Sequence, residues 1–478
     1  MNGTKKIIID SHCHYFNGGF ALREAIAIGW NKLRGNYPYK KTLRETGVQK
    51  FAAPAVISKF MASVEGWADL LSYVVNLLKV TTQSCQGNYE YNVDEFRKSK
   101  MGYNSELITA PLMMDIYFIL DNNKDEASSL TKRPLQTLAP SSPVDIEDDD
   151  ELFKQYVAEV KQNVNALLQD NDENLKLGIR PTKTFNNIID ELFETIEQEF
   201  ISESKRAKEL SVRQKDYLSP GYKNHLMDLI SLQRSNKERV FPFLAIDPRR
   251  YGIMNLIEQY INDENSPFKG IKLYPPLGYL PSHPNLVPVY EYCIKNDVPI
   301  TVHTSSGGVP NFRKEIFVQS FDEAHGNKCV KLKEMGITAQ AYFANPDNWI
   351  PVLNKYENLR LNFAHFGGND QCLKYPGNDD NWTNKIINIM ERYEKTHPNI
   401  YCDISYYAKS ESQSVINQIM LDHPIVKKRL MFGTDYIMIM MAYKLGGLAS
   451  YYNLYNKLDD EQCFENAKRF LKVGNAPS

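Results

Sequence analysis

The chain has 478 residues, more than one average domain needs but within the range of an α/β barrel that carries insertions. Its 56 Lys and Arg residues nearly balance 58 Asp and Glu residues, and a net charge of −2 gives no field that would attract nucleic acid or an anionic membrane. Seven scattered cysteines without a CxxC pair favour reduced thiols. We therefore expect a cytoplasmic protein, with no secretion signal or membrane span, that acts on a small molecule; a homo-oligomer stays open.

The first predicted element is a strand within residues 5–16, where a run of isoleucines leads to His12 and His14. Alternate side chains of a strand lie on the same face, so the two histidines point the same way. Two imidazoles in this arrangement are able to hold one metal ion, because neutral histidine is a common ligand of zinc and related metals. The competing interpretation is an ordinary polar end of a strand.

Two long helical segments follow, at residues 17–107 and 121–239, with a second strand at 108–120 between them. From residue 240 onward, strands and helices alternate regularly. The six further strands are predicted at 240–246, 270–274, 298–303, 359–365, 400–404 and 430–435, and a last helix at 459–472.

Eight strands connected by helical crossovers predict a (β/α)8 TIM barrel with large helical insertions after strands 1 and 2. Its strands would come from residues 1–16, 108–120 and 240–478. The connections 17–107 and 121–239 are too long for bare loops, so we expect them to form helical insertions.

In such a barrel the active site lies at the C-terminal ends of the strands. Five side chains able to bind a metal end predicted strands: His12, His14, His303, His365 and Asp435. Three nitrogens and one carboxylate suit Zn²⁺, and also Mn²⁺ or Fe²⁺. The Asp435 carboxylate is able to bind the metal and to accept the proton of a metal-bound water, although an Asp after Gly-Thr is also common in turns.

The same rule sorts the remaining histidines. His397 and His423 precede strands, so we expect them on the opposite, structural face of the barrel. His225 lies in the inserted helices and is expected on the surface. His283 and His325 follow strands 4 and 5 and stay open as substrate contacts.

A lysine in the fourth strand is expected to point into the barrel. The two-residue period of a strand turns Lys272 inward, between Ile271 and Leu273. A buried lysine is costly unless it is paired or modified. Three alternatives stay open: a carboxylate partner, an anionic group of the substrate, or carbamylation that bridges two metal ions. Arg249, which follows strand 3, suits a substrate carboxylate or phosphate, or a salt bridge within the loops.

Taken with these residues, the sequence resembles the amidohydrolase superfamily, in particular its amidohydrolase-related branch of metal-dependent TIM-barrel hydrolases. The matching segments are Asp10–His14, Ala245–Arg249, Gly270–Pro276, Val302–His303, Ala364–Gly368, Phe432–Tyr436 and Asn466–Phe470. The resemblance covers strand 1 and residues 240–473. Its motifs are specific for the fold and the metal site, and they do not specify the substrate.

The resemblance implies a set of metal ligands. His12, His14, His303 and Asp435 would bind a divalent metal ion, for which we expect Zn²⁺, with Mn²⁺ or Fe²⁺ as alternatives. His365 would bind a second metal or act as acid and base beside a single one. Asp435 and His365 are thus the expected catalytic residues.

The implied reaction is hydrolysis of a C–N or C–O bond (amide, lactone or ester) of a small molecule by a metal-activated water. The same branch contains non-oxidative decarboxylases with the same ligands, so decarboxylation of a small aromatic or unsaturated acid is the alternative. A metal-bound scaffold without catalysis is disfavoured, because every ligand position is filled. We expect four residues to contact the substrate: Lys272, Arg249, Tyr274 and His283.

Overall fold

The computed structural model describes residues 5–35, 53–81, 84–123, 146–169, 182–209, 218–263, 265–378, 380–442 and 447–473. The chain divides into two compact units. The first consists of Met1–Phe16, Gln83–Ala127 and His225–Ser478, and the second of Asn17–Thr82 and Ser128–Asn224. The domain boundaries inferred from the sequence stay a prediction.

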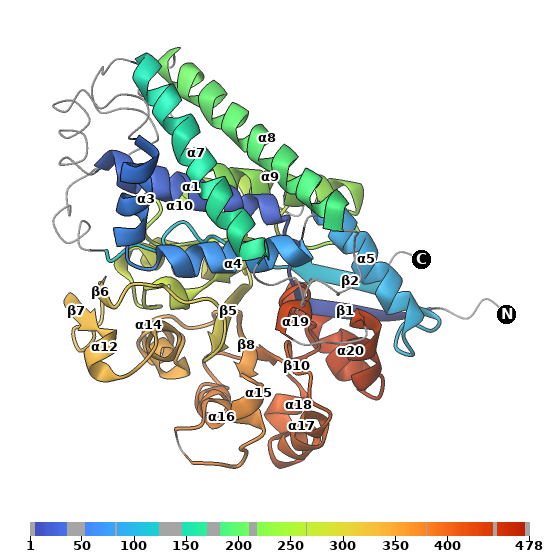
Figure 1. The fold of residues 1–478 in the computed structure, drawn as a ribbon. Helices are drawn as coiled ribbons and strands as arrows, with labels where there is room; N and C mark the ends of the chain where they lie inside the picture. The colour runs from blue at the N-terminus through green and yellow to red at the C-terminus, as the bar shows by residue number, and fades with distance from the viewer. Residues whose placement is uncertain are drawn as a thin grey trace. The chain divides into compact units, whose positions relative to one another are not determined.

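Parallel strands form the core of the first unit (Figure 1). Within the described residues these strands are β1 (Lys6–Cys13), β2 (Ser105–Pro111), β3 (Phe243–Ala245), β4 (Gly270–Leu273), β5 (Ile300–Ser305), β8 (Leu361–Gly367), β9 (Ile400–Asp403) and β10 (Leu430–Met431). β1 pairs with β2, and the others pair in the order β3-β4-β5-β8-β9-β10.

Backbone contacts join these two sheets at both seams. At the first seam, Thr109 of β2 bridges Val240, just before β3. At the second, the Ser11 amide of β1 donates to the Phe432 carbonyl, just beyond β10, at 3.0 Å. The strands therefore follow one another around a (β/α)8 TIM barrel, which confirms the predicted fold class.

A side-chain clamp reinforces the second seam. The Asp10 carboxylate accepts hydrogen bonds from the Thr434 amide at 2.9 Å and from the Thr434 hydroxyl at 2.6 Å. Burial raises the pKa of Asp10 to about 7, although these donors act to lower it. One residue further along, the Asp435 amide donates to the His12 carbonyl at 2.7 Å. This seam brings Asp435 next to His12.

Helices connect the barrel strands. The longer ones are α5 (Cys85–Lys98), α10 (Ile253–Tyr260), α11 (Val287–Asn296), α14 (Ile350–Lys355), α16 (Trp382–Arg392), α17 (Glu411–Asp422), α20 (Leu448–Leu454) and α21 (Asn466–Leu471). The shorter ones are α12 (Leu332–Met335), α13 (Ala339–Phe343), α15 (Asn369–Cys372), α18 (Pro424–Lys427) and α19 (Met438–Ala442). Side-chain caps explain several helix starts: Asn381 Oδ1, for example, accepts from the Thr383 and Asn384 amides at the start of α16.

A hairpin follows β5 that the sequence analysis does not predict. It consists of the antiparallel strands β6 (Glu315–Val318) and β7 (Lys328–Lys331). Ile316 and Val330 face one hydrophobic cluster with Leu280, so the hairpin packs against the loop that follows β4. Strands of four residues give too short an alternation of polar and apolar residues to stand out in the sequence.

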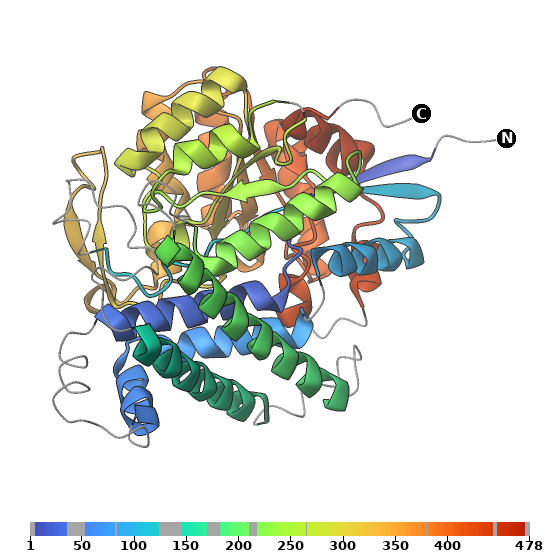
Figure 2. The same ribbon diagram turned by 90° about the horizontal axis from the view of Figure 1, so that it is seen from above.

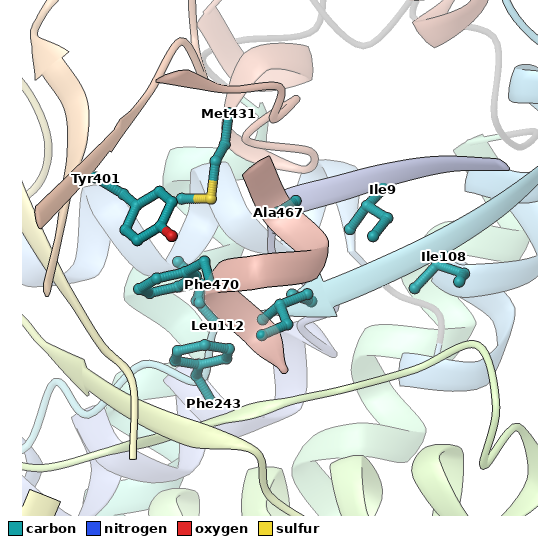
Figure 3. Close-up of a cluster of buried hydrophobic side chains, with 10 residues drawn as sticks. Ile9, Ile108, Leu112, Phe243, Tyr401, Met431, Ala467 and Phe470 are labelled. Atoms are coloured by element: carbon teal, nitrogen blue, oxygen red, sulfur yellow. The ribbon is translucent and has the colours of Figure 1, made fainter. Parts of the chain in front are cut away.

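A hydrophobic cluster ties the barrel strands to the C-terminal helix (Figure 3). Its members are Ile9, Ile108, Ala110, Leu112, Phe243, Tyr401, Met431, Ala467, Phe470 and Leu471. They come from β1, β2, β3, β9, β10 and α21 and from the residue just after β2, so both sheets share one core. Each large apolar side chain buried here contributes about 1.5–3 kcal/mol to folding.

The second unit is helical in its described residues. Its helices are α1 (Gly18–Gly35), α3 (Ala53–Ser63), α4 (Trp67–Val80), α7 (Ile146–Gln169) and α8 (Thr182–Glu209), and α9 (Pro220–Ser235) begins here and continues into the first unit. α7 and α8 lie alongside one another (Figure 2). The Tyr156 hydroxyl donates to the Ile26 carbonyl at 3.1 Å, which ties α7 to α1. No helix in the described part of the chain is both long and apolar enough to cross a membrane.

We expect the Asp10–Thr434 clamp to stabilise the barrel seam measurably. Thr434→Val keeps the side-chain shape but removes the hydroxyl donor from a buried carboxylate, which costs about 1–3 kcal/mol of unfolding free energy. Thr383→Val is the control, because that hydroxyl donates to the neutral Phe366 carbonyl. Urea unfolding of both variants measures the difference. A smaller loss in Thr434→Val than in Thr383→Val would contradict the clamp.

Candidate functional site

The five strand-end side chains inferred from the sequence lie together. His12 and His14 come from β1, His303 from β5, His365 from β8, and Asp435 from the segment after β10, and all are buried. The His12 ring lies 5.3 Å from His14 and 4.5 Å from His365 between centroids, and His365 lies 4.6 Å from His303.

Three of these side chains form a group that suits a metal ion. Asp435 Oδ1 lies 3.2 Å from His14 Nε2 and 3.5 Å from His12 Nε2, and the ligating atoms all lie within 4.8 Å of one another. Within the described part of the chain, neither His12 Nε2 nor Asp435 Oδ1 has a hydrogen-bond partner. Buried polar atoms are nearly always paired, so two unpaired ones on facing side chains suit a shared ligand such as a metal ion.

His303 joins the cluster through His365. His365 Nε2 lies 3.0 Å from His303 Nδ1, and His303 Nε2 lies 2.9 Å from the Gly307 carbonyl. Burial lowers the pKa of both rings, that of His365 to about 3. Both histidines are therefore neutral at physiological pH, the form that binds metal.

A second carboxylate, missed by the sequence analysis, lies behind the histidines. Asp403 ends β9, and its Oδ2 lies 3.1 Å from His12 Nδ1 and 2.7 Å from Asn362 Nδ2, while its Oδ1 accepts from the His365 amide at 3.0 Å. Burial alone would raise the pKa of Asp403, but His12, His365 and Ser405 outweigh it and hold the pKa well below its usual range. The strand-end rule that selects Asp435 applies equally to Asp403.

Lys272 is buried inside the barrel, as the strand period predicts. It pairs in register with Ala245 and Thr301 on the neighbouring strands. Burial lowers its pKa to about 8, although the charges of Asp403 and Asp435 act to raise it. Among the described residues, Lys272 Nζ has no hydrogen-bond partner.

The other three predicted substrate contacts have partners of their own. The Tyr274 ring lies 4.6 Å from His303, and its hydroxyl accepts from the Val309 amide at 3.0 Å. Arg249 forms a buried ion pair with Asp247 at 2.5 Å and also donates to the Leu277 carbonyl. The structure thus contains the salt bridge that was one alternative for Arg249.

His283 caps a 3-10 helix in the loop after β4. Its Nδ1 accepts from the Asn285 amide at 3.2 Å at the start of η4 (Pro284–Leu286). Burial lowers its pKa to about 3, with a further contribution from Arg249. Its role as a substrate contact, like those of Lys272 and Tyr274, stays a prediction.

The expectation for His225 is wrong. This residue, placed on the surface by the sequence analysis, is fully buried on α9, and its ring lies 5.5 Å from Phe16. Burial lowers its pKa to about 4, and His14 is among the neighbours that affect it. A helix in an insertion gives no strand-end signal, so its position could not be inferred. His397 is buried and contacts the Tyr356 carbonyl, consistent with a structural role.

The backbone turns sharply where the site residues lie. His365, Phe366 and Asp435 have left-handed backbone angles, with φ of 66°, 43° and 56°. Such angles cost energy for residues with a side chain and concentrate at functional sites. Here they redirect two site residues as their strands end.

Comparison with known proteins identifies the family. Residues 229–473, more than half of the chain, match the sequence model of the amidohydrolase family, and the chain belongs to this family. The resemblance inferred from the motifs is thereby confirmed. The family and the buried His and Asp donors support a divalent metal ion in an enzyme of the amidohydrolase superfamily. The comparison with curated proteins gave no match.

Solved structures with similarity to the chain include three bacterial proteins. An uncharacterised TIM-barrel protein from Bordetella bronchiseptica has 18% identity over 52% of this chain and 72% of that chain, with a TM-score of 0.33. A 5-carboxyvanillate decarboxylase from Sphingomonas paucimobilis has 11% identity over 53% and 72%, with a TM-score of 0.33. An amidohydrolase from Burkholderia multivorans has 12% identity over 53% and 80%, with a TM-score of 0.33.

The buried amine of Lys272 predicts a pH dependence of stability. Its pKa is about 8 in the folded chain, against an ordinary value of 10.5, so between these values the unfolded chain binds more protons. Lys272 alone should therefore add about 2 kcal/mol of stability between pH 8 and 10, whereas buried cysteines such as Cys13, whose pKa is raised by burial, act in the opposite direction. Urea unfolding of metal-free wild type and Lys272→Met at pH 8 and 10 isolates this contribution, because the wild type should gain about 2 kcal/mol relative to the variant.

The exposed Lys333→Met is the control and should change with pH as the wild type does. An equal pH dependence in the wild type and Lys272→Met would contradict the assignment of a free buried amine to Lys272; a carbamylated Lys272 would give that result.

Proposed function

We propose that this chain is a metal-dependent hydrolase that cleaves an amide, lactone or ester bond of a small molecule. The observation that carries the proposal is the pair of buried atoms His12 Nε2 and Asp435 Oδ1, which face each other without a hydrogen-bond partner in the described chain. Membership of the amidohydrolase family supports the reaction class.

The donor set fits one divalent ion. His12, His14 and Asp435 already lie within reach of a common ion, and His303 would complete a three-histidine, one-carboxylate set. To ligate through Nε2, His303 would have to give up its contact with the Gly307 carbonyl. Zn²⁺ suits these ligands best, and Mn²⁺ or Fe²⁺ are alternatives.

Each side chain in and around this donor set has a separate role in the proposed reaction. When bound, a divalent ion supplies positive charge that polarises a substrate carbonyl and makes water more acidic. Asp435 then accepts the proton that the attacking water gives up. His365 acts as acid and base beside this set, and Lys272 binds an anionic group of the substrate.

Decarboxylation on the same ligands is the second candidate. The observation that favours it is the buried amine of Lys272, which has no hydrogen-bond partner among the described residues and would suit a substrate carboxylate. Turnover in ¹⁸O-labelled water separates the two reactions. Hydrolysis places the label in the product, whereas decarboxylation releases carbon dioxide and leaves the rest of the product unlabelled.

The metal assignment predicts the metal content of purified protein. Protein purified without chelator should carry one tightly held divalent ion per chain, or two if His365 binds a second, as measured by plasma mass spectrometry. His12→Ala removes a ligand and should lower the occupancy sharply. The half-buried His325→Ala, outside the histidine cluster, is the matched control and should keep the full content. Equal metal content in both variants would contradict the assignment of His12 as a metal ligand.

Replacement of Asp435 and replacement of His365 should change turnover and metal content in different ways. Asp435→Asn keeps one carbonyl oxygen but removes the charge and the proton acceptor, so turnover should fall on the order of 10²–10⁴ while metal affinity weakens less. His365→Asn should lower turnover with nearly unchanged metal content. The assay uses the first substrate turned over in a panel of small amides, lactones and esters.

A loss of half the metal in His365→Asn would instead indicate a two-metal site. Lys272 would then be the expected carbamylated bridge, and metal loading should depend on bicarbonate in the wild type but not in Lys272→Ala. Full metal in Lys272→Ala without a bicarbonate effect leaves Lys272 as a substrate or structural contact.

A further inference from the structure

A serine hydroxyl lies between two site histidines and the carboxylate of Asp403. Ser405 Oγ lies 3.0 Å from His12 Nδ1, 2.9 Å from His365 Nδ1 and 2.5 Å from Asp403 Oδ1. All four side chains are buried. The hydrolytic scheme above gives this hydroxyl no part, although it contacts both a metal ligand and the expected acid–base residue.

The partners of these atoms establish the direction of each hydrogen bond. Asp403 accepts from Asn362 Nδ2 and from the backbone amides of His365 and Ser405, so it acts as an acceptor throughout. Ser405 has one hydroxyl proton and donates it to Asp403, which leaves its oxygen as an acceptor for the rings.

Both imidazoles must therefore carry their hydrogen on Nδ1. His12 Nδ1 also faces Asp403 Oδ2 at 3.1 Å, and an ionised carboxylate oxygen only accepts. His365 Nδ1 also faces the Ser405 carbonyl oxygen at 3.4 Å, and a carbonyl only accepts. A neutral ring with hydrogen on Nδ1 has a free lone pair on Nε2.

The Nε2 atoms face the front of the site. His12 Nε2 lies 3.5 Å from Asp435 Oδ1. His365 Nε2 lies 3.0 Å from His303 Nδ1 and accepts its hydrogen, so the lone pair of His303 lies on Nε2, where a metal ion would replace the contact with the Gly307 carbonyl. The back of the His12 ring is thus held by Ser405 and Asp403 and that of the His365 ring by Ser405, and the front of each is directed at the other candidate ligands.

We propose that Ser405 is a positioning residue that joins His12 and His365 to the single carboxylate of Asp403 and so determines which ring nitrogen each histidine presents to metal and substrate. The proposal deepens the metal-dependent function proposed above and rests on it for its metal readout. Ser405 acts through the rings and does not itself touch the reacting atoms.

A second metal ion is the competing explanation for the same residues. Ligating atoms of His12, His365 and Asp403 lie within 4.8 Å of one another, which is close enough to hold an ion. The hydrogen-bonded arrangement is favoured because the Ser405 hydroxyl already lies within 3.0 Å of all three side chains. An ion at this position would have to displace that hydroxyl.

The first experiment measures metal affinity in matched serine variants. Ser405→Ala should weaken Zn²⁺ binding by about 10–100-fold in a competition titration with a chromophoric chelator, the range typical of lost partners of metal ligands. Ser412→Ala is the control, because Ser412 is also fully buried and its hydroxyl donates to the Asn369 side chain at 2.6 Å. It should bind Zn²⁺ as the wild type does.

A double-mutant cycle then tests whether Ser405 and Asp403 act as one unit. The loss of affinity in the Ser405→Ala, Asp403→Asn double variant should be well below the sum of the two single losses. Additive losses would overturn the proposal. Wild-type protein that binds two ions, of which one is lost in Asp403→Asn and kept in Ser405→Ala, would overturn it in favour of the second metal.

The second experiment needs no metal. In metal-free protein with ¹⁵N-labelled histidine, the His365 ring, assigned by its absence in His365→Asn, should be protonated on Nδ1. Ser405→Ala should shift it towards a mixture of tautomers, whereas Ser412→Ala should leave it unchanged. A wild-type ring protonated on Nε2 would overturn the proposal.

The two experiments separate the two proposals. A wild-type chain with the expected spectrum but without metal binding supports the positioning role and contradicts the metal-dependent function. A chain that binds metal equally well in both serine variants supports the metal site and overturns the positioning role.

Discussion

The candidate site depends on how the last barrel strand meets the first. Asp10 accepts two hydrogen bonds from Thr434, and this clamp aligns the HxH end of β1 with the residue that follows Thr434, which is Asp435. The approach is close, since a Cβ at Gly433 would lie 2.8 Å from His12 Cβ, so only glycine fits between the two segments. Three candidate ligands from opposite ends of the sequence meet because the barrel closes here.

The Asp403 carboxylate behind the histidines is fully hydrogen-bonded, whereas several polar atoms on the opposite side of the rings have no partner in the described chain. Asp403 receives hydrogen bonds from side chains and backbone, and a buried carboxylate without them would be strongly destabilising. In the described chain, unpaired buried atoms include His12 Nε2, Asp435 Oδ1 and Lys272 Nζ. The hydrogen bonds around Asp403 stabilise the fold on one side of the histidine rings. The fold therefore tolerates unpaired groups on the other side, where a ligand would pair with them.

The sequence predicted the part of the site that follows from strand ends. His12, His14, His303, His365 and Asp435 were recognisable because metal-binding residue types end predicted strands. Asp403 met the same rule and was overlooked, since a lone Asp at a strand end is common. Ser405 and His225 could not be inferred, because their positions depend on a loop turn and on the packing of an inserted helix. The strands of the β6–β7 hairpin were too short to give a periodic signal.

The ion pairs at the strand ends limit which charged side chains a substrate would contact. Arg249 and Arg250 are each bound bidentately by a buried aspartate, Asp247 and Asp115 respectively, so their charges are already neutralised within the loops. Lys272 lies deeper, near Asp403 and Asp435, whose charges act on its pKa. If all three side chains are ionised, the two carboxylates outnumber the amine, and a divalent cation would reverse the sign of the local charge. An anionic substrate group beside Lys272 would therefore be electrostatically compatible with a metal-bound site and disfavoured without the metal, which would couple the proposed substrate binding to metal binding.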